Sequence, residues 1–163
     1  MNSILAIVLS IGALSFAHAA AAQKDIPGFK YLGTSEVQQS GIGINGVGIM
    51  ASYYLSRDSA NWVTAFSNCN DIGGRLAYPM NPVANDELRR FLVVEDLRAN
   101  AWIGARSTGT NWIWESNFNT AMSWSSWASG CGTGYNACGY FISNGGTWCH
   151  AGCSSTMSYI CQF

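Results

Sequence analysis

Six cysteines place the strongest constraint on what this chain of 163 residues can fold into. They are Cys69, Cys131, Cys138, Cys149, Cys153 and Cys161. An even number of cysteines in an exported chain is typical of a disulfide framework. Six cysteines permit many different pairings, and their spacing alone does not choose among them.

The start of the chain indicates export. Residues 4–17 are apolar and uncharged, and Ala17-His18-Ala19 has the small-x-small form of a signal-peptidase site. We therefore expect residues 1–22 to be a signal peptide that is cut between positions 19 and 22. The alternative is an uncleaved anchor, but the run is shorter than the roughly 20 residues that a membrane span needs. The mature protein is expected to be secreted and extracellular, with no membrane span.

Zinc binding is the alternative use of the cysteines. Cys131, Cys138, Cys149 and Cys153, together with His150, would offer enough soft ligands. However, the spacing lacks paired C-x2-C knuckles, and an exported protein meets an oxidising environment. We expect three disulfides, no zinc and no other cofactor.

The charge and composition exclude several classes of protein. The chain has 8 Lys+Arg and 9 Asp+Glu, and only 10% of its residues are charged, so it does not suit binding to nucleic acid through phosphate neutralisation. The residues needed for Ser/His/Asp or Cys/His catalysis are also missing, because His150 is the only histidine after the expected signal and no G-x-S-x-G motif occurs. We expect a single non-enzymatic domain.

Two helices are predicted in the first half of the domain. Ser59 is expected to cap the first helix, and Gly73-Gly74 to end it. A second helix is predicted from Asn85, with Asp86 and Glu87 in its first turn. The apolar face of the first helix follows i, i+3, i+4 and i+7 spacing at Trp62, Ala65, Phe66 and Cys69.

Residues 23–50 are predicted to be a leader and a first hairpin. Asn45-Gly46 has the chemistry of a tight turn, and the hairpin would close on residues 50–55. Gly41, Gly43 and Gly46 also fit G-x-G-x-x-G, but no helix is predicted after them, so the dinucleotide-binding interpretation is rejected.

The remaining motifs carry a family resemblance. After the two helices come Trp102-Ile103-Gly104-Ala105, the expected hairpin at Trp112-Ile113-Trp114, Ser126-Trp127 and Gly146-Thr147-Trp148, with the last cysteines in order. Over residues 53–163 the sequence resembles a C-type lectin-like domain, in the short form because no cysteine precedes Cys69. The resemblance implies an α+β fold for residues 51–163, in which two helices flank small antiparallel sheets with a long, disulfide-stapled loop region.

The resemblance also implies a disulfide pairing. It joins Cys69 to Cys161 and Cys138 to Cys153, and this leaves Cys131 to pair with Cys149. In calcium-dependent members of the family, a Glu-Pro-Asn or Gln-Pro-Asp loop and a Trp-Asn-Asp strand hold the ion. Those positions read Cys131-Gly132-Thr133 and Trp148-Cys149-His150 here. Our hypothesis is that a disulfide replaces the calcium bridge.

The supply of carboxylates supports the same expectation. Calcium takes six to eight oxygen ligands, usually including several carboxylates. Between residues 97 and 163 the only carboxylate side chain is Glu115. We therefore expect the protein to be independent of calcium.

The aromatic part from Ser107 onward, where Glu115 is the only charged side chain among Asp, Glu, Lys and Arg, suggests where a ligand would bind. Most tryptophans are expected in the core, including Trp102, Trp112, Trp114 and Trp148, and His150 is expected in a partly exposed loop. Trp127 and Tyr135 lie among Gly and Ser and are expected to be exposed. The candidate ligand-binding residues are Trp127, Thr133, Tyr135, Asn136, Asn117 and Asn119.

Three functions compete at this point. The family resemblance makes carbohydrate binding the first expectation, and the missing calcium motifs allow a protein-binding module without sugar recognition. The partner would be a glycan or an extracellular protein. A third hypothesis is ice binding or another surface activity, which an uncharged Ser, Thr and Gly surface would permit. The oligomeric state is not predicted.

Overall fold

The computed structural model describes residues 25–37, 49–94 and 100–163. The expected signal peptide and the Asn45-Gly46 turn lie outside these described residues. The elements, in chain order, are β1 (Phe29–Val37), β2 (Ile49–Ser56), α1 (Trp62–Asp71), β3 (Arg75–Leu76), α2 (Pro82–Val94), β4 (Ala101–Thr108), β5 (Asn111–Trp114), the 3-10 turn η1 (Glu115–Asn117), β6 (Thr120–Ala121), β7 (Ala137–Ile142), β8 (Thr147–Gly152) and β9 (Ser158–Gln162).

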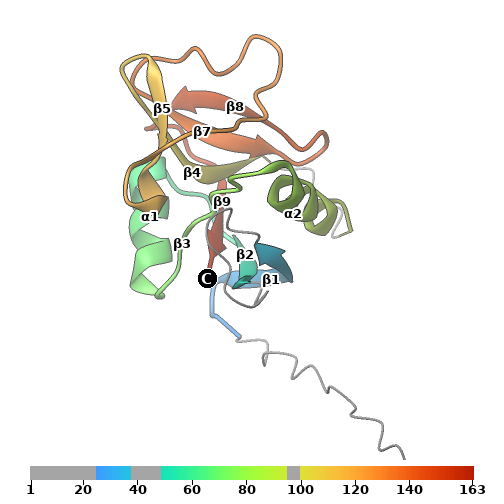
Figure 1. Cartoon of the computed structure of the whole chain (residues 1–163). Coiled ribbons are helices and arrows are strands. Elements are labelled where there is room, and N and C mark those ends of the chain that lie inside the picture. The colour runs from blue at the N-terminus through green and yellow to red at the C-terminus, as the bar shows by residue number, and fades with distance from the viewer. Residues whose placement is uncertain (1–24, 38–48, 95–99) are drawn as a thin grey trace, which may run out of the picture.

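The strands form a lower and an upper part that meet at β9 (Figure 1). In the lower part, β1 pairs with β2 and β2 with β9, all antiparallel. In the upper part, β4 lies beside β5 and β7, and β8 extends the sheet beyond β7. The short pairing of β4 with β9 is parallel, and it joins the two antiparallel parts into one mixed sheet.

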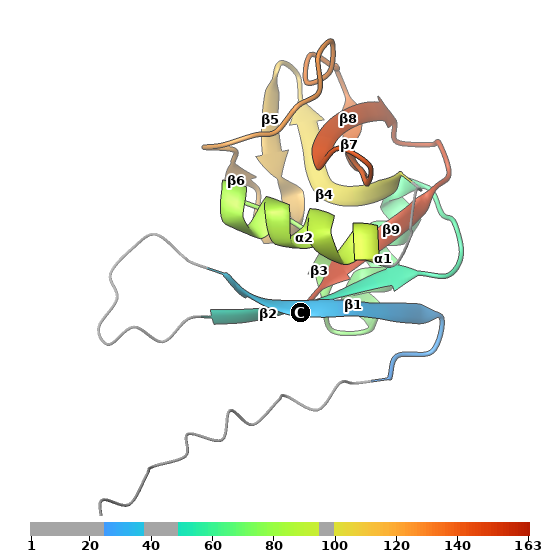
Figure 2. The same cartoon turned by 90° about the vertical axis from the view of Figure 1, so that its right-hand side faces the viewer.

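The hairpin of β1 and β2 belongs to the lower part of the sheet. The two strands pair from Phe29 opposite Ser56 to Val37 opposite Ile49, with one irregularity between Tyr31 and Gly33. The division expected between residues 50 and 51 therefore lies within β2. Figure 2 shows α2 packed over this hairpin, with the upper strands on its other side.

Both helices begin at an asparagine that caps the first turn. Asn61 Oδ1 accepts a hydrogen bond from the Thr64 N–H at 2.9 Å, so the expectation that Ser59 caps α1 is wrong. The reason is that Ala60 pairs with Met157 in an extended bridge, and the helix cannot begin until the chain leaves it. In α2, Asn81 Oδ1 accepts from the Ala84 N–H at 2.9 Å.

The second helix also begins earlier than predicted. Pro82 occupies its first position, where the missing N–H costs nothing and the fixed φ suits a helix. Asp86 and Glu87 therefore lie in the second turn, where they pair with Arg89 and Arg90. The sequence signal for the true start was the Asn81-Pro82 pair.

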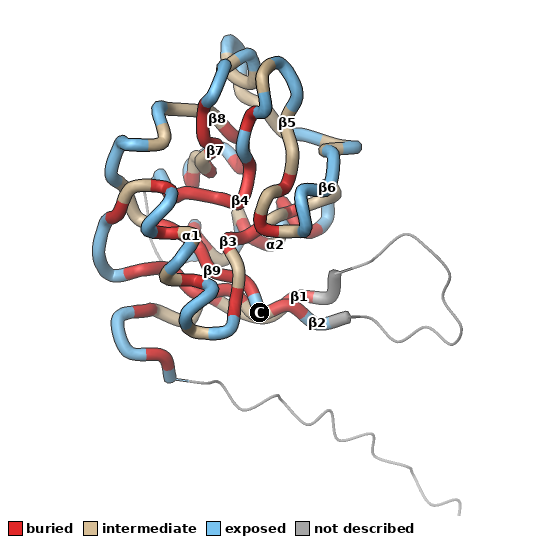
Figure 3. The backbone as a smooth tube through the Cα atoms, turned by 90° about the vertical axis from the view of Figure 1, so that its left-hand side faces the viewer, coloured by how far each residue is buried: buried red, intermediate tan, exposed pale blue. Residues whose placement is uncertain are grey.

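Two of the largest aromatic side chains in the core have their polar atoms satisfied. Trp62 and Trp102 are almost fully buried, and each indole N–H donates to a backbone carbonyl, of Ile103 at 2.8 Å and Ala60 at 3.0 Å. The Cys69–Cys161 disulfide ties α1 to β9. Figure 3 shows buried residues along β4 and β9, whereas the loops at the end near β5 and β8 are largely exposed.

No helix in the described ranges is long and apolar enough to cross a membrane.

Candidate functional site

The segment that connects β6 to β7 is held against β8. The Ala128 N–H donates to the Trp148 carbonyl, and the Trp148 N–H donates to the Ser126 carbonyl, both at 2.8 Å. Further along the segment, the Cys131–Cys149 disulfide adds a covalent tie. The exposed end of the domain therefore carries a loop with a defined position.

The six cysteines form three disulfides. The pairs are Cys69 with Cys161, Cys138 with Cys153, and Cys131 with Cys149, which is the pairing that the family resemblance implies. Disulfide formation leaves no thiol for the four-cysteine zinc site that the sequence permitted.

Gly132 connects the loop to two different strands. Its N–H donates to His150 Nδ1 on β8 at 3.1 Å, and its carbonyl accepts from Trp112 Nε1 on β5 at 2.8 Å. Its φ is +85°, and a Cβ at this position would lie 2.6 Å from Trp127 Cγ. Only glycine can make this approach without displacing the indole ring.

A cluster of five tryptophans packs beneath the loop that Gly132 belongs to: Trp112, Trp114, Trp124, Trp127 and Trp148. Trp148 is fully buried, and the rings of Trp114, Trp124 and Trp127 meet it edge to face at centroid distances of 5.3, 5.3 and 5.6 Å. Trp127 also packs on Trp112, with the ring centroids 4.4 Å apart. These contacts hold the cluster together through geometry that aromatic pairs favour.

The observed burial of the tryptophans agrees with the predictions for some of them and differs for others. Trp102, Trp114 and Trp148 are buried as predicted. Trp112 is only partly buried, and Trp127, which was expected to be exposed, is half-buried because it packs between Trp112 and Trp148. His150 lies on β8 and not in a loop, although it is partly exposed as expected.

A groove of about 330 Å³ opens beside this cluster. One wall comes from β5 and the turn before it, and the other from the end of β6 and the chain that follows it. All its lining side chains are uncharged: Thr110, Asn111, Trp112, Ala121, Met122, Ser123, Trp124, Ser125 and Trp127. The groove thus combines indole rings with exposed hydroxyl and amide groups, and we take it as the candidate functional site.

The predicted site residues do not assemble into one surface. Thr133, Tyr135 and Asn136 are exposed on the loop before β7, with Tyr135 close to Gly109 in the β4–β5 turn. Asn117 and Asn119 lie beyond the other end of β5, where Asn117 Nδ2 contacts Met80 Sδ at 3.4 Å. Of the six predicted residues, only Trp127 lines the groove.

Sequence reasoning missed Trp124 and the polar residues beside it, Asn111, Ser123 and Ser125. The run Ser123-Trp124-Ser125-Ser126-Trp127 could have signalled them, because it alternates hydroxyl groups with indole rings. The contribution of Asn111 had no local signal, because it comes from β5 and reaches the groove only through folding.

The residues at the family's calcium positions do not fit a calcium ion. Cys131 and Cys149 are bonded to each other, and His150 offers a nitrogen, whereas calcium requires oxygen ligands. Glu115 is engaged elsewhere: both its oxygens accept from Arg106 Nη1, at 2.8 and 3.0 Å. Cys131, Cys149 and His150 therefore offer a calcium ion no oxygen ligand from their side chains.

A second cleft, of about 480 Å³, lies between the start of β1, α1 and β9. It contains both signs of charge, from Arg57, Asp58 and Asp71. Tyr159 lines it as well, and burial raises the pKa of its hydroxyl, which accepts a hydrogen bond from Asn68 at 2.8 Å. This mixed-charge cleft differs in character from the uncharged groove.

Comparison with protein families gives a match over most of the described domain. The model for the Lectin C-type domain matches residues 58–163. Collectin-10 of Xenopus tropicalis is 28% identical over 115 residues, which are 68% of this chain and 41% of that protein. Collectin-10 of Gallus gallus is 27% identical over 115 residues, which are again 68% of this chain and 41% of that protein. The chain thus spans about two fifths of the length of these curated relatives.

Solved structures show the same fold. Human lithostathine has a TM-score of 0.61 and 24% identity, covering 69% of this chain and 91% of that chain. The carbohydrate-recognition domain of the mouse scavenger receptor C-type lectin has a TM-score of 0.62 and 20% identity, covering 69% and 87%. TC14, from the tunicate Polyandrocarpa misakiensis, has a TM-score of 0.59 and 17% identity, covering 69% and 97%.

Proposed function

Because the chain belongs to the C-type lectin domain family, we propose that it is a secreted, non-catalytic recognition module that binds carbohydrate without calcium. We place the ligand in the groove lined by Trp112, Trp124 and Trp127. The observation that carries this proposal is the combination of indole rings and uncharged hydrogen-bonding groups along one groove.

The groove has the chemistry that a neutral sugar requires. A sugar ring presents C–H groups on its faces, which pack against indole rings, and hydroxyl groups at its edge, which need hydrogen-bond partners. Asn111 and Ser123 are exposed beside the rings and offer such partners. Polar groups placed at the edge of an apolar surface are typical of small-molecule sites.

Calcium independence is part of the proposal. In this chain the disulfide between Cys131 and Cys149 would hold the loop in place of a calcium ion, because it ties the loop to β8. A loop that is already ordered loses little conformational entropy when a ligand binds. Sugar hydroxyls would then contact protein groups directly rather than a metal.

Three disulfides and the expected signal peptide support extracellular location. Recognition without catalysis is supported by the absence of charged side chains from the groove lining, since acid–base chemistry needs a titratable group next to the substrate.

A glycan array on the oxidised domain, run with calcium and again with a chelator, tests the ligand class and the metal together. We expect selective binding to neutral glycans that survives the chelator. Binding that requires calcium would overturn the calcium-free mechanism.

Two matched variants test the location of the site. Asn111→Ala combined with Ser123→Ala removes exposed polar groups from the groove, whereas Tyr135→Ala removes an exposed ring from the loop before β7. We expect the first variant to lose sugar binding and the second to keep it, with both folded as judged by near-ultraviolet circular dichroism. The opposite result would place the site at residues 133–136.

The alternative function is protein binding without sugar recognition. Tyr135 and Phe118 are 72% and 79% exposed, and exposed aromatic rings are frequent anchors in protein interfaces. Two results together would favour this function. The array would show no glycan binding with or without calcium, and the domain would capture an extracellular protein in a way that Tyr135→Ala abolishes.

A further inference from the structure

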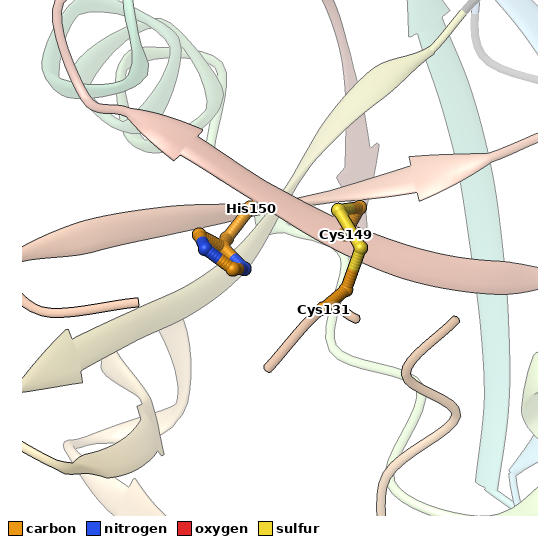
Figure 4. A group of neighbouring side chains, drawn as sticks. All are labelled: Cys131, Cys149 and His150. Atoms are coloured by element: carbon orange, nitrogen blue, oxygen red, sulfur yellow. A yellow bond between two sulfur atoms is a disulfide. The ribbon is translucent and has the colours of Figure 1, made fainter. Parts of the chain in front are cut away.

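The Cys131–Cys149 disulfide has an imidazole beside it (Figure 4). The two sulfur atoms and one imidazole nitrogen of His150 all lie within 4.8 Å of one another. All three residues are partly exposed, so solvent and small ions reach them. The geometry therefore gathers two sulfurs and a nitrogen at one accessible point.

Access distinguishes this disulfide from the other two. Both residues of the Cys69–Cys161 disulfide are fully buried, whereas Cys138–Cys153 combines a fully buried Cys138 with a partly exposed Cys153. Both residues of the Cys131–Cys149 pair are partly exposed. A thiolate can approach either sulfur of Cys131–Cys149 but only the Cys153 sulfur of Cys138–Cys153, so the Cys131–Cys149 bond should react first.

Opening this bond need not release the loop. The hydrogen bonds of Ala128 and Ser126 with Trp148 remain, as does the bond from Trp112 Nε1 to the Gly132 carbonyl. The core keeps the Cys69–Cys161 and Cys138–Cys153 ties. Cys131 and Cys149 would therefore stay opposite each other as two thiols.

We propose that the Cys131–Cys149 disulfide is a latent metal site, which a dithiol reductant opens and which then binds Zn²⁺ through Cys131, Cys149 and His150. The dithiol transfers two electrons and two protons to the disulfide and becomes a disulfide itself. Zn²⁺ then displaces the two thiol protons, and a water molecule fills the fourth position. Two cysteines and one histidine with an open position form a known zinc ligand set.

The donor types favour zinc over the ion that the family uses at this place. Thiolates select soft or borderline metals, whereas calcium takes oxygen ligands. The hydrogen bond from the Gly132 N–H to Nδ1 orients the ring. Coordination through Nδ1 would replace this bond, and coordination through Nε2 would retain it.

The test uses the oxidised protein, treated with limiting dithiothreitol that is removed under argon before metal is added. Alkylation and peptide mapping should show free thiols at Cys131 and Cys149 first. Zinc titration should give one bound ion per chain, and Co²⁺ should produce the thiolate-to-cobalt charge-transfer absorption of a tetrahedral site. The oxidised protein should show neither.

Two variants separate the ligands. His150→Gln should weaken zinc binding by more than about 100-fold, beyond the loss typical of an outer-sphere partner. Cys131→Ser with Cys149→Ser, treated in the same way, should bind no metal. The proposal fails if Cys138–Cys153 opens first, if both thiols form without metal uptake, or if circular dichroism shows that opening this bond unfolds the domain.

Discussion

The indole N–H of Trp148 donates to Asn85 Oδ1 at 2.8 Å, and through this bond α2 supports the strand that holds the loop. Asn85 also donates from Nδ2 to the Gly146 carbonyl at 2.7 Å, so one buried amide satisfies two polar groups of the upper part. The groove therefore depends on a helix that contributes no residue to its lining.

Replacing Asn85 with alanine should destabilise the domain by about 2–4 kcal/mol. The change leaves the Trp148 N–H buried without a partner, and such a group costs about 1–3 kcal/mol. The Gly146 carbonyl loses its shorter hydrogen bond and keeps only the one from Ser126 Oγ at 3.3 Å. Urea denaturation of the oxidised protein measures the loss. A double-mutant cycle with Trp148→Phe supplies the control, because additive effects would show that the amide and the indole do not interact.

The contact between Gly132 and Trp127 can be separated from backbone strain. Gly130 and Gly132 both have positive φ, +78° and +85°, but an added Cβ meets nothing within 4 Å at Gly130. Gly130→Ala should therefore show only the cost of the left-handed conformation, about 1 kcal/mol. Gly132→Ala should cost more and shift the tryptophan fluorescence, because its Cβ collides with Trp127. Equal losses in the two variants would contradict the close contact.

Removing the Cys131–Cys149 disulfide should lower the free energy of unfolding by about 3 kcal/mol. The bond closes a segment between residues 18 positions apart, and a loop of this size contributes roughly this much by restricting the unfolded chain. The Cys131→Ser, Cys149→Ser protein should still fold, and calcium should not restore the lost stability. Recovery on adding calcium would show that an ion can take the place of the disulfide.

Alkaline pH should destabilise the domain through Tyr53. Its hydroxyl is buried and makes no hydrogen bond of good geometry, although the nearby Ser35 hydroxyl lowers its pKa. Burial is the larger effect and raises the pKa from 10.0 to about 12. The unfolded chain releases this proton first, so stability is retained below pH 10 and falls by about 1.4 kcal/mol per pH unit between pH 10 and 12.

Tyr53→Phe isolates this contribution. The variant should be at least as stable as the parent at pH 7, because it removes an unpartnered polar atom, and it should lose less stability when the pH rises. Denaturation midpoints of both proteins across this pH range give the comparison, and parallel curves would contradict the role of Tyr53.

Several features followed from local patterns in the sequence. The spacing of Trp62, Ala65 and Cys69 predicted the buried face of α1, and the structure buries all three. The order of the motifs around Trp102 and Trp148 predicted the family, and the match over residues 58–163 confirms it. These signals are readable because a helix period or a family motif lies within a short stretch of chain.

The helix starts show where local signals compete. Ser59 and Asn61 are both capable N-caps, but the bridge between Ala60 and Met157 keeps the chain extended until residue 60. Met157 is distant in sequence, so its effect on the start of α1 could not be foreseen from the neighbouring residues.

The sequence by itself determined the cysteine content, the shortage of charge in the C-terminal part and the family. Only the tertiary structure decided which tryptophans face solvent and where a ligand could lie. Trp127 is half-buried because Trp112 and Trp148 come from other strands to cover it. Tyr135 and Asn117 lie toward opposite ends of β5 although both belong to the same part of the sequence, which is poor in charge. The exposure of a side chain depends on contacts between segments far apart in the chain, and these contacts cannot be deduced from composition.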